Sequence, residues 1–148
     1  MTDEKYMRHA IAEAKVAKEE GEWPFGAVIV RNSEVISVGH CRESKTRNVL
    51  MHAETQAVSG ACTKLSSNKL NDCVIYCTNE PCPMCAAAIF QAKIGRVVIG
   101  ATRDDLAHLF RKRALSINEL ALDSGYPIEI TRGILKNEVL DLFSSITK

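Results

Sequence analysis

The spacing of apolar and polar residues divides the first part of the chain into a helix and a hairpin. In residues 5–18 the apolar positions recur at helical spacing and the charged positions lie mostly between them, which predicts an amphipathic helix that ends before Pro24. Residues 25–39 then form two β-rich runs separated by Asn32 and Ser33, which are turn-forming residues. We therefore expect a β-hairpin after the first helix.

The middle of the chain alternates between strand and helix patterns. Residues 40–51 have no clean period, which indicates a loop, and residues 52–62 predict a helix of about three turns. Two short apolar runs, 73–78 and 96–100, are rich in β-branched residues and flank a helical span over 83–93. A strand, a helix and a strand of this length predict a parallel βαβ unit.

The final third has a weaker pattern. Residues 101–126 contain helix formers without a strict apolar stripe, and we expect them to be mostly helical with a break near Ser124-Gly125. Residues 127–131 predict a short strand. Gly133 separates it from a closing helix over 136–146, whose expected apolar face contains Val139, Leu140 and Phe143.

Composition narrows the class of protein. A chain of 148 residues with 46% hydrophobic and 25% charged residues is typical of one compact globular domain, here 1–148. The formal net charge of +1 removes any whole-molecule attraction to nucleic acid, although local patches remain possible. The N-terminal residues lack the apolar core of a secretory signal, and no apolar run approaches the ~20 residues of a membrane span. We expect a cytoplasmic protein without a membrane segment, so its six cysteines are expected to be thiols or metal ligands.

Cys82 and Cys85 are spaced as a Cys-x-x-Cys pair, with Pro83 suited to the first position of a helix. Amide N–H groups and the helix dipole stabilise thiolates at such an end, and the thiolate is the form that binds zinc. The pair alone also fits a redox dithiol, a structural zinc site or two buried apolar side chains. A metal site is preferred over these alternatives only if other residues of the chain can act as further ligands.

His52 is the preferred third ligand. The alternative, a four-cysteine site with Cys73 and Cys77, is disfavoured because four residues of a strand span ~13 Å, too far for both sulfurs to reach one ion. One histidine and two cysteines leave the fourth tetrahedral position of zinc for water, as in catalytic sites. Glu54 lies two residues after His52 and is placed to act as general base. Taken singly, His52 and Glu54 also fit an ordinary helix end.

The combination of His-x-Glu with Pro-Cys-x-x-Cys about thirty residues later is the signature of zinc deaminases. With "EWPFGAVIV", "HAETQAV", "NEPCPMCAAAIFQAKIGRVVIGA" and the tail "IEITRGILKNEVLDLF", the chain resembles the cytidine and deoxycytidylate deaminase superfamily, in the branch of tRNA adenosine, guanine and fungal-type cytosine deaminases. The resemblance runs nearly end to end, and the tail is similar to that of the tRNA enzymes.

The resemblance implies an α/β fold, namely a three-layer α/β/α sandwich on a mixed five-stranded sheet, and a homodimer. It implies one Zn²⁺ per chain on His52, Cys82 and Cys85, and attack by zinc-bound hydroxide on the amine-bearing ring carbon, with Glu54 as proton shuttle. It also implies substrate-binding positions, for which ordinary packing is the competing interpretation: Phe25, Cys41, Ala53, His108 and Phe110.

Two segments depart from the family pattern. Cys41 stands where relatives commonly have a substrate-contacting asparagine, and a thiol is a weak hydrogen-bonding group. Residues 104–116, "DDLAHLFRKRALS", replace a glycine-rich loop of the tRNA enzymes. The basic residues of this segment and of the loop before the second helix fit either phosphate contacts or a solvated charged face: Arg111, Lys112, Arg113, Arg42, Lys45 and Arg47.

Three functions remain open from the sequence. The first is a zinc hydrolase that deaminates a nucleobase, nucleoside or related small aminated heterocycle of the guanine or cytosine type. The second is a tRNA adenosine deaminase, supported by the tail and opposed by the near-neutral charge and the altered loop. The third is a non-catalytic binding module stabilised by zinc, which Glu54 beside an open coordination position disfavours.

Overall fold

A mixed five-stranded sheet forms the centre of the computed structural model, which describes residues 2–147. The strands are β1 (Gly26–Arg31), β2 (Glu34–His40), β3 (Val74–Asn79), β4 (Arg96–Ala101) and β5 (Glu129–Arg132). They are ordered β2-β1-β3-β4-β5, with β1 antiparallel to both neighbours and β3, β4 and β5 mutually parallel. The predicted mixed five-stranded sheet is confirmed.

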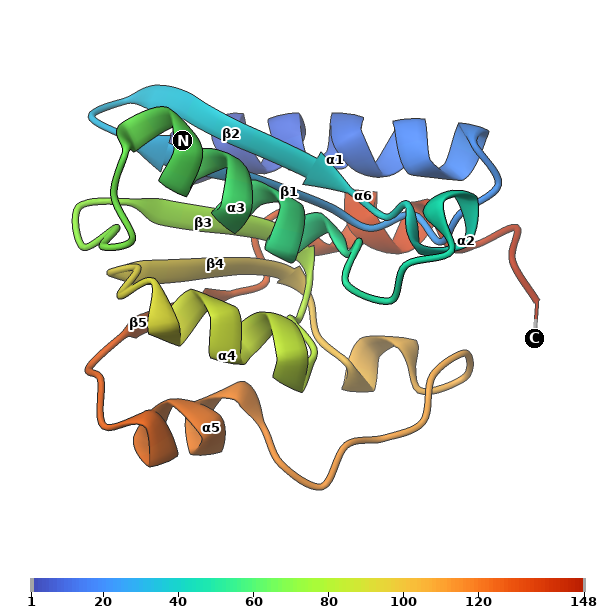
Figure 1. Cartoon of the computed structure of the whole chain (residues 1–148). Helices are drawn as coiled ribbons and strands as arrows, with labels where there is room; N and C mark the ends of the chain where they lie inside the picture. The colour runs from blue at the N-terminus through green and yellow to red at the C-terminus, as the bar shows by residue number, and fades with distance from the viewer. Residues whose placement is uncertain (1, 148) are drawn as a thin grey trace.

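Helices cover both faces of the sheet (Figure 1). One layer contains α1 (Thr2–Glu19) and α6 (Lys136–Asp141), and the other contains α3 (Ala53–Leu65), α4 (Pro83–Gln91) and α5 (Ile117–Ser124). Each layer has its own buried apolar cluster against the sheet, one around Met7, Val98 and Phe143 and the other around Ile75, Ile89 and Ile99. This is the predicted α/β/α sandwich. Within residues 2–147 no helix has the length and hydropathy needed to cross a bilayer.

The hairpin and the βαβ unit form where the sequence predicts them. Asn32 and Ser33 both have positive φ, 50° and 63°, as a two-residue turn between right-twisted strands requires. Pro83 opens α4 at a position where its missing N–H is not needed, and α4 connects the parallel strands β3 and β4. The unit places the β3–α4 loop, which ends with Cys82, at the carboxyl end of β3.

The prediction that residues 101–126 are mostly helical is wrong. Only a single 3₁₀ turn, η1 (Asp104–Leu106), and α5 are helical there, and residues 107–116 are irregular. Without a continuous apolar stripe the segment is anchored at separate points, by buried Leu106 and Leu109 and by a hydrogen bond of 2.8 Å from Arg103 Nε to the carbonyl of Arg111. Gly125, at φ 72°, ends α5 at the predicted break.

The loop predicted over 40–51 is also more ordered than expected. Strand β2 extends to His40, and a one-turn helix, α2 (Glu43–Thr46), follows it. The carboxylate of Glu22 accepts the N–H groups of Ser44 and Lys45 at 3.1 and 2.7 Å, and thus satisfies the first amides of α2 from a distant part of the chain. A local sequence window does not contain this cap.

The last elements are shorter than predicted. Helix α6 ends at Asp141, and turns continue beyond it. Val139 and Phe143 are buried as expected, whereas Leu140 is only half-buried and Leu142 is buried instead. This layer supports the wall of the cavity described below, because Phe143 packs against Phe25 with ring centroids 5.8 Å apart.

Candidate metal centre and adjoining cavity

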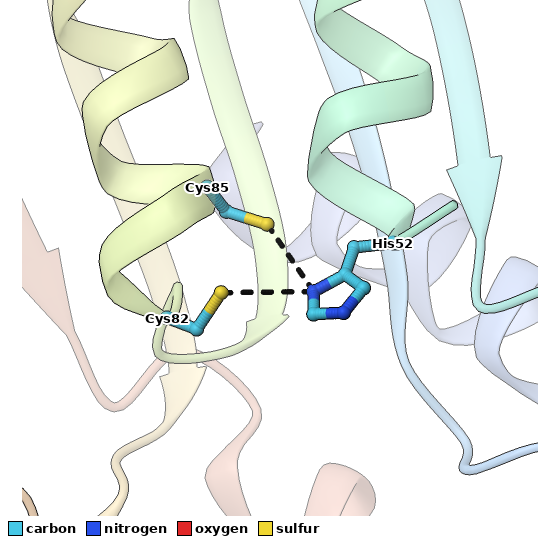
Figure 2. Close-up of side chains that lie close together, drawn as sticks. All are labelled: His52, Cys82 and Cys85. Carbon is cyan, nitrogen blue, oxygen red and sulfur yellow. Dashed lines mark hydrogen bonds between the residues drawn. The ribbon is translucent and has the colours of Figure 1, made fainter. Parts of the chain in front are cut away.

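Two helix N-termini bring the predicted metal ligands together. His52 is the residue immediately before α3, and Cys82 is the residue immediately before α4, with Cys85 in the first turn of that helix. Figure 2 shows the three side chains pointing toward one another across the gap between the two helices. Both helix ends present unpaired amide N–H groups and positive dipole ends, which favour the thiolates that a cation needs.

The geometry fits a zinc ion. His52 Nδ1 lies 3.6 Å from Cys82 Sγ and 3.5 Å from Cys85 Sγ. With Zn–S of about 2.3 Å and Zn–N of about 2.0–2.1 Å, a tetrahedral ion separates nitrogen from sulfur by roughly 3.5 Å. Within residues 2–147 these three side chains form the one group of histidine, cysteine or acidic ligands close enough to hold an ion. They supply three ligands and leave one tetrahedral position for another molecule.

The surroundings of the two cysteines shift their pKa values in opposite directions. A hydrogen bond with Cys85 and a second with His52 lower the pKa of Cys82 to about 4. The same hydrogen bond and burial raise the pKa of Cys85, so Cys82 gives up its proton more readily than Cys85 does. The hydrogen bond to Cys82 raises the pKa of His52. Zinc binds the deprotonated forms of cysteine and histidine, so the zinc affinity of the three ligands should depend on pH.

Glu43 orients the histidine ligand and was missed by the sequence reasoning. Its Oε2 lies 3.3 Å from His52 Nε2, on the side of the ring opposite the sulfurs. A carboxylate at Nε2 favours the tautomer with the proton there, so that Nδ1 offers its lone pair to the metal. Glu43 begins α2, the helix that the sequence did not predict, and no local signal linked it to His52.

Glu54 is a buried acid beside the metal ligands. It lies in the first turn of α3, and 8% of its surface is exposed. Burial, reinforced by the negative charge of Cys82, raises its pKa to about 7 in the metal-free chain. A carboxyl group with a pKa near neutrality can both accept and release a proton, as general acid–base chemistry needs.

A cavity of about 110 Å³ adjoins the metal ligands. Three of the five predicted substrate-binding residues line it, namely Phe25, Ala53 and Phe110. Their role in binding stays a prediction. The other lining residues come from the metal site, from the carboxyl ends of β3 and β4, and from η1 and the irregular segment after it: His52, Glu54, Asn79, Glu80, Cys82, Thr102, Arg103, Leu106 and Arg113.

Cys41 and His108 do not line this cavity, and their role in substrate binding stays a prediction. Cys41 is buried in packing, where its Sγ lies 3.8 Å from Glu22 Oε1 and its N–H donates to the carbonyl of Phe25. His108 is exposed, because the irregular segment buries Leu106 and Leu109 and turns His108 outward. Residues 104–116 depart from the family pattern, so the resemblance did not specify where His108 points.

Aromatic rings form one wall of the cavity. Phe110 lies 5.8 Å from Phe25 and 4.8 Å from Trp23 between ring centroids, and the guanidinium of Arg103 lies 4.9 Å over the Phe110 ring. Trp23 does not itself line the cavity, and it packs against Phe110. Such flat apolar walls suit a planar heterocycle.

The polar lining could have been predicted in part. Ligands of α/β proteins bind at the carboxyl ends of parallel strands. Asn79 ends β3 and Thr102 directly follows β4, so the predicted βαβ unit already places both residues where a ligand would bind. Cys73 and Cys77 are free and buried, and lie outside the metal group, in agreement with the rejection of a four-cysteine site.

Fold and site together define a zinc-binding α/β protein with a small, partly aromatic cavity beside the metal. Residues 1–101 match the family described as the cytidine and deoxycytidylate deaminase zinc-binding region, and the chain belongs to that family. His52, Cys82 and Cys85 are accordingly a group that can hold one zinc ion.

Three relatives illustrate the range of the family. A tRNA-specific adenosine deaminase of Bacillus subtilis is 46% identical over 100 residues, which cover 67% of this chain and 62% of the length of that relative. A Schizosaccharomyces pombe protein described as a probable cytosine deaminase is 33% identical over 144 residues, covering 93% of this chain and 88% of its own. A solved structure from work on tRNA:A34 deaminases is 30% identical with a TM-score of 0.83, covering 93% of this chain and 98% of its own.

Proposed function

We propose that the chain is a zinc-dependent hydrolytic deaminase that removes the exocyclic amine of a nucleobase or a closely related aminated heterocycle. The observation that carries the proposal is the buried carboxyl group of Glu54 beside a three-ligand zinc site that opens into an aromatic-walled cavity. Family membership and the named activities of the relatives support the same reaction class.

In this proposal His52, Cys82 and Cys85 hold the zinc, which when bound supplies a Lewis acid that makes water a better nucleophile. Glu54 takes a proton from the attacking water and passes it to the ring nitrogen next to the amine-bearing carbon. It then helps protonate the amine, which leaves as ammonia while the ring carbon keeps the oxygen. The overall change is one water consumed and one ammonia released.

The cavity walls orient the ring. Phe25 and Phe110 offer apolar faces to a planar base, and Ala53 and Asn79 line the cavity beside the metal ligands. A volume of about 110 Å³ favours a single heterocyclic ring system with its substituents directed outward.

A free nucleobase or nucleoside is the first candidate substrate. The cytosine deaminase relative matches 93% of the chain, and the near-neutral net charge gives no whole-molecule attraction to nucleic acid. The second candidate is adenosine in a tRNA anticodon, favoured by the higher identity of that tRNA deaminase.

The experiment is ammonia release by zinc-loaded protein from cytosine, guanine, adenine, their nucleosides and a tRNA anticodon stem-loop. Glu54→Gln, which keeps the size of the side chain, is the matched control. Release from a free base or nucleoside by the wild type, absent in the variant, supports the first candidate. Release from the stem-loop alone supports the second, and silence on every substrate would leave the zinc-stabilised binding module as the better account.

We also propose that the chain forms a homodimer and acts in the cytoplasm, as its resemblance to the family implies. Val49 and Leu50, which precede the metal ligand His52, are 67% and 54% exposed, and such adjacent apolar side chains suit a subunit contact. Sedimentation velocity of the zinc-loaded protein tests the dimer, and Leu50→Asp should shift it toward monomer.

A further inference from the structure

The one-turn helix α2 carries the carboxylate that faces the metal ligand His52. Glu43 is the first residue of α2, and its Oε2 lies 3.3 Å from His52 Nε2. A helix of four residues is not stable alone, because so few hydrogen bonds do not offset the cost of nucleating the turn. The place of Glu43 beside His52 therefore depends on whatever holds α2.

The support of α2 comes from a distant part of the chain. Arg42, the residue before the helix, makes no side-chain cap, and the first amides of a helix have no partner within it. Glu22 supplies the missing acceptors: its Oε1 accepts the N–H of Ser44 at 3.1 Å, and its Oε2 accepts the N–H of Lys45 at 2.7 Å. Because each oxygen holds a different amide, the two contacts fix the direction of α2 as well as its position.

Glu22 is itself held by the end of α1. Gly21 has a φ of 83°, the left-handed conformation that ends the helix, and the N–H of Glu22 donates to the carbonyl of Ala17 at 3.0 Å. Figure 1 shows α2 beside the segment that follows α1. The side chain therefore starts from a fixed point of the backbone.

The Glu22 carboxylate is buried and charged. Only 8% of the residue is exposed. Burial opposes the charge, but the hydrogen bonds from the N–H groups of Lys45 and Ser44 outweigh it and lower the pKa of Glu22 below its ordinary value. A second contact between the same segments, from Lys45 Nζ to Glu20 Oε2 at 2.9 Å, involves a lysine side chain that is 52% exposed, and such pairs contribute little. Glu22 is therefore the stronger anchor of α2.

We propose that Glu22 is a positioning residue of the zinc site, which holds α2 so that Glu43 orients His52 for the metal. The contacts run from the end of α1 through Glu22 and Glu43 to the imidazole. The inference rests on the zinc site of the proposed function and does not depend on which substrate is deaminated.

The test is a double-mutant cycle on zinc affinity, measured by competition between the zinc-loaded full chain and a chromophoric chelator. The proteins are wild type, Glu22→Gln, Glu43→Ala and the double variant. Glutamine keeps the size of the side chain but loses its charge and one of its two acceptor oxygens. Glu19→Gln, which neutralises an exposed carboxylate at the end of α1, is the matched control for charge.

A second control separates positioning from a general loss of stability. Asp3→Asn weakens the contact with Arg96 at the amino end of β4, whereas the zinc ligands lie at the carboxyl end of the parallel strands. We expect Asp3→Asn and Glu19→Gln to leave the zinc affinity of the folded protein unchanged.

We expect Glu22→Gln to weaken zinc binding about three- to tenfold, at most by as much as the loss of Glu43 itself. In the Glu43→Ala background the same change should alter zinc affinity by less than about twofold, because the contact that Glu22 supports is already gone. If Glu22→Gln does not fold, Glu22→Asp replaces it in both backgrounds. Aspartate keeps the charge on a shorter side chain, so a smaller loss in the same direction is expected.

Amide hydrogen exchange gives a second measurement. The N–H groups of Ser44 and Lys45 should exchange faster in Glu22→Gln than in Glu19→Gln, since they lose their acceptor. Equal exchange of these amides in the two variants would show that Glu22 does not hold α2.

Unchanged zinc affinity in Glu22→Gln, or an equal loss with and without Glu43, would overturn the inference. Its failure is distinguishable from failure of the proposed function. A wild type that binds zinc and releases ammonia, beside a Glu22→Gln protein that binds zinc equally well, would refute the positioning role alone. A wild type that binds no zinc would refute the zinc site and the inference with it.

Discussion

Removal of the Glu43 carboxylate should weaken zinc binding without touching a metal ligand. Glu43 Oε2 lies 3.3 Å from His52 Nε2. Without this carboxylate the imidazole of His52 is free to rotate and to adopt the other tautomer. Outer carboxylates of this kind are commonly worth about 10–100-fold in metal affinity. Because the Glu43 side chain is 45% exposed and the contact is longer than 3 Å, we expect the lower end for Glu43→Ala, about tenfold or about 1.4 kcal/mol.

The assay is competition for zinc between the protein and a chromophoric chelator at neutral pH. Glu19→Ala removes an exposed carboxylate from the end of α1 and serves as the control for net charge. Glu43→Gln should recover part of the loss, because its amide oxygen can still accept the Nε2 proton. A Glu43→Ala protein that holds zinc as tightly as Glu19→Ala would refute the assigned orienting role.

Three other substitutions test the frame around the site. Asp3→Asn should cost about 1–2 kcal/mol at pH 7, because Asp3 accepts two hydrogen bonds from Arg96 that lower its pKa below the ordinary 3.8. This contribution is complete above pH 3.8 and disappears as the pH falls through the lower folded-state pKa, so urea unfolding at pH 7 and at pH 2–3 should show a shrinking difference. Phe143→Ala should destabilise by about 3–5 kcal/mol in urea unfolding and also lower kcat/KM, since its ring supports Phe25. Cys77→Ala should keep one zinc per chain by metal analysis, and loss of the metal would revive the four-cysteine site.

The regular part of the fold was predictable because its signals are local. The first helix, the hairpin turn at Asn32 and Ser33, and the Pro83 helix start each follow from a few neighbouring residues, and the structure contains them all. The segment over 101–126 was not predictable in the same way. Its conformation depends on anchors distant in sequence, such as the burial of Leu106 and Leu109, and helix formers without an apolar stripe did not specify a helix.

The residues of the site also divide into those that a short sequence motif reveals and those that it does not. The ligands His52, Cys82 and Cys85 carry a spacing that sequence alone reveals, and the structure brings them together. Glu43 contacts His52 through a helix that is capped by Glu22, which lies 21 positions earlier in the chain, so no short motif contains the contact. Cys41 and His108 were expected in the cavity by resemblance, and packing in this chain places them elsewhere.

The most direct test of the proposed function measures zinc content and ammonia release together in wild type and Glu54→Gln, on the best substrate of the panel. We predict that both proteins hold one zinc per chain and that the variant loses at least about 10²–10⁴-fold in kcat, because a single carboxyl group serves several proton transfers. Wild-type turnover in a zinc-loaded Glu54→Gln protein would contradict the account.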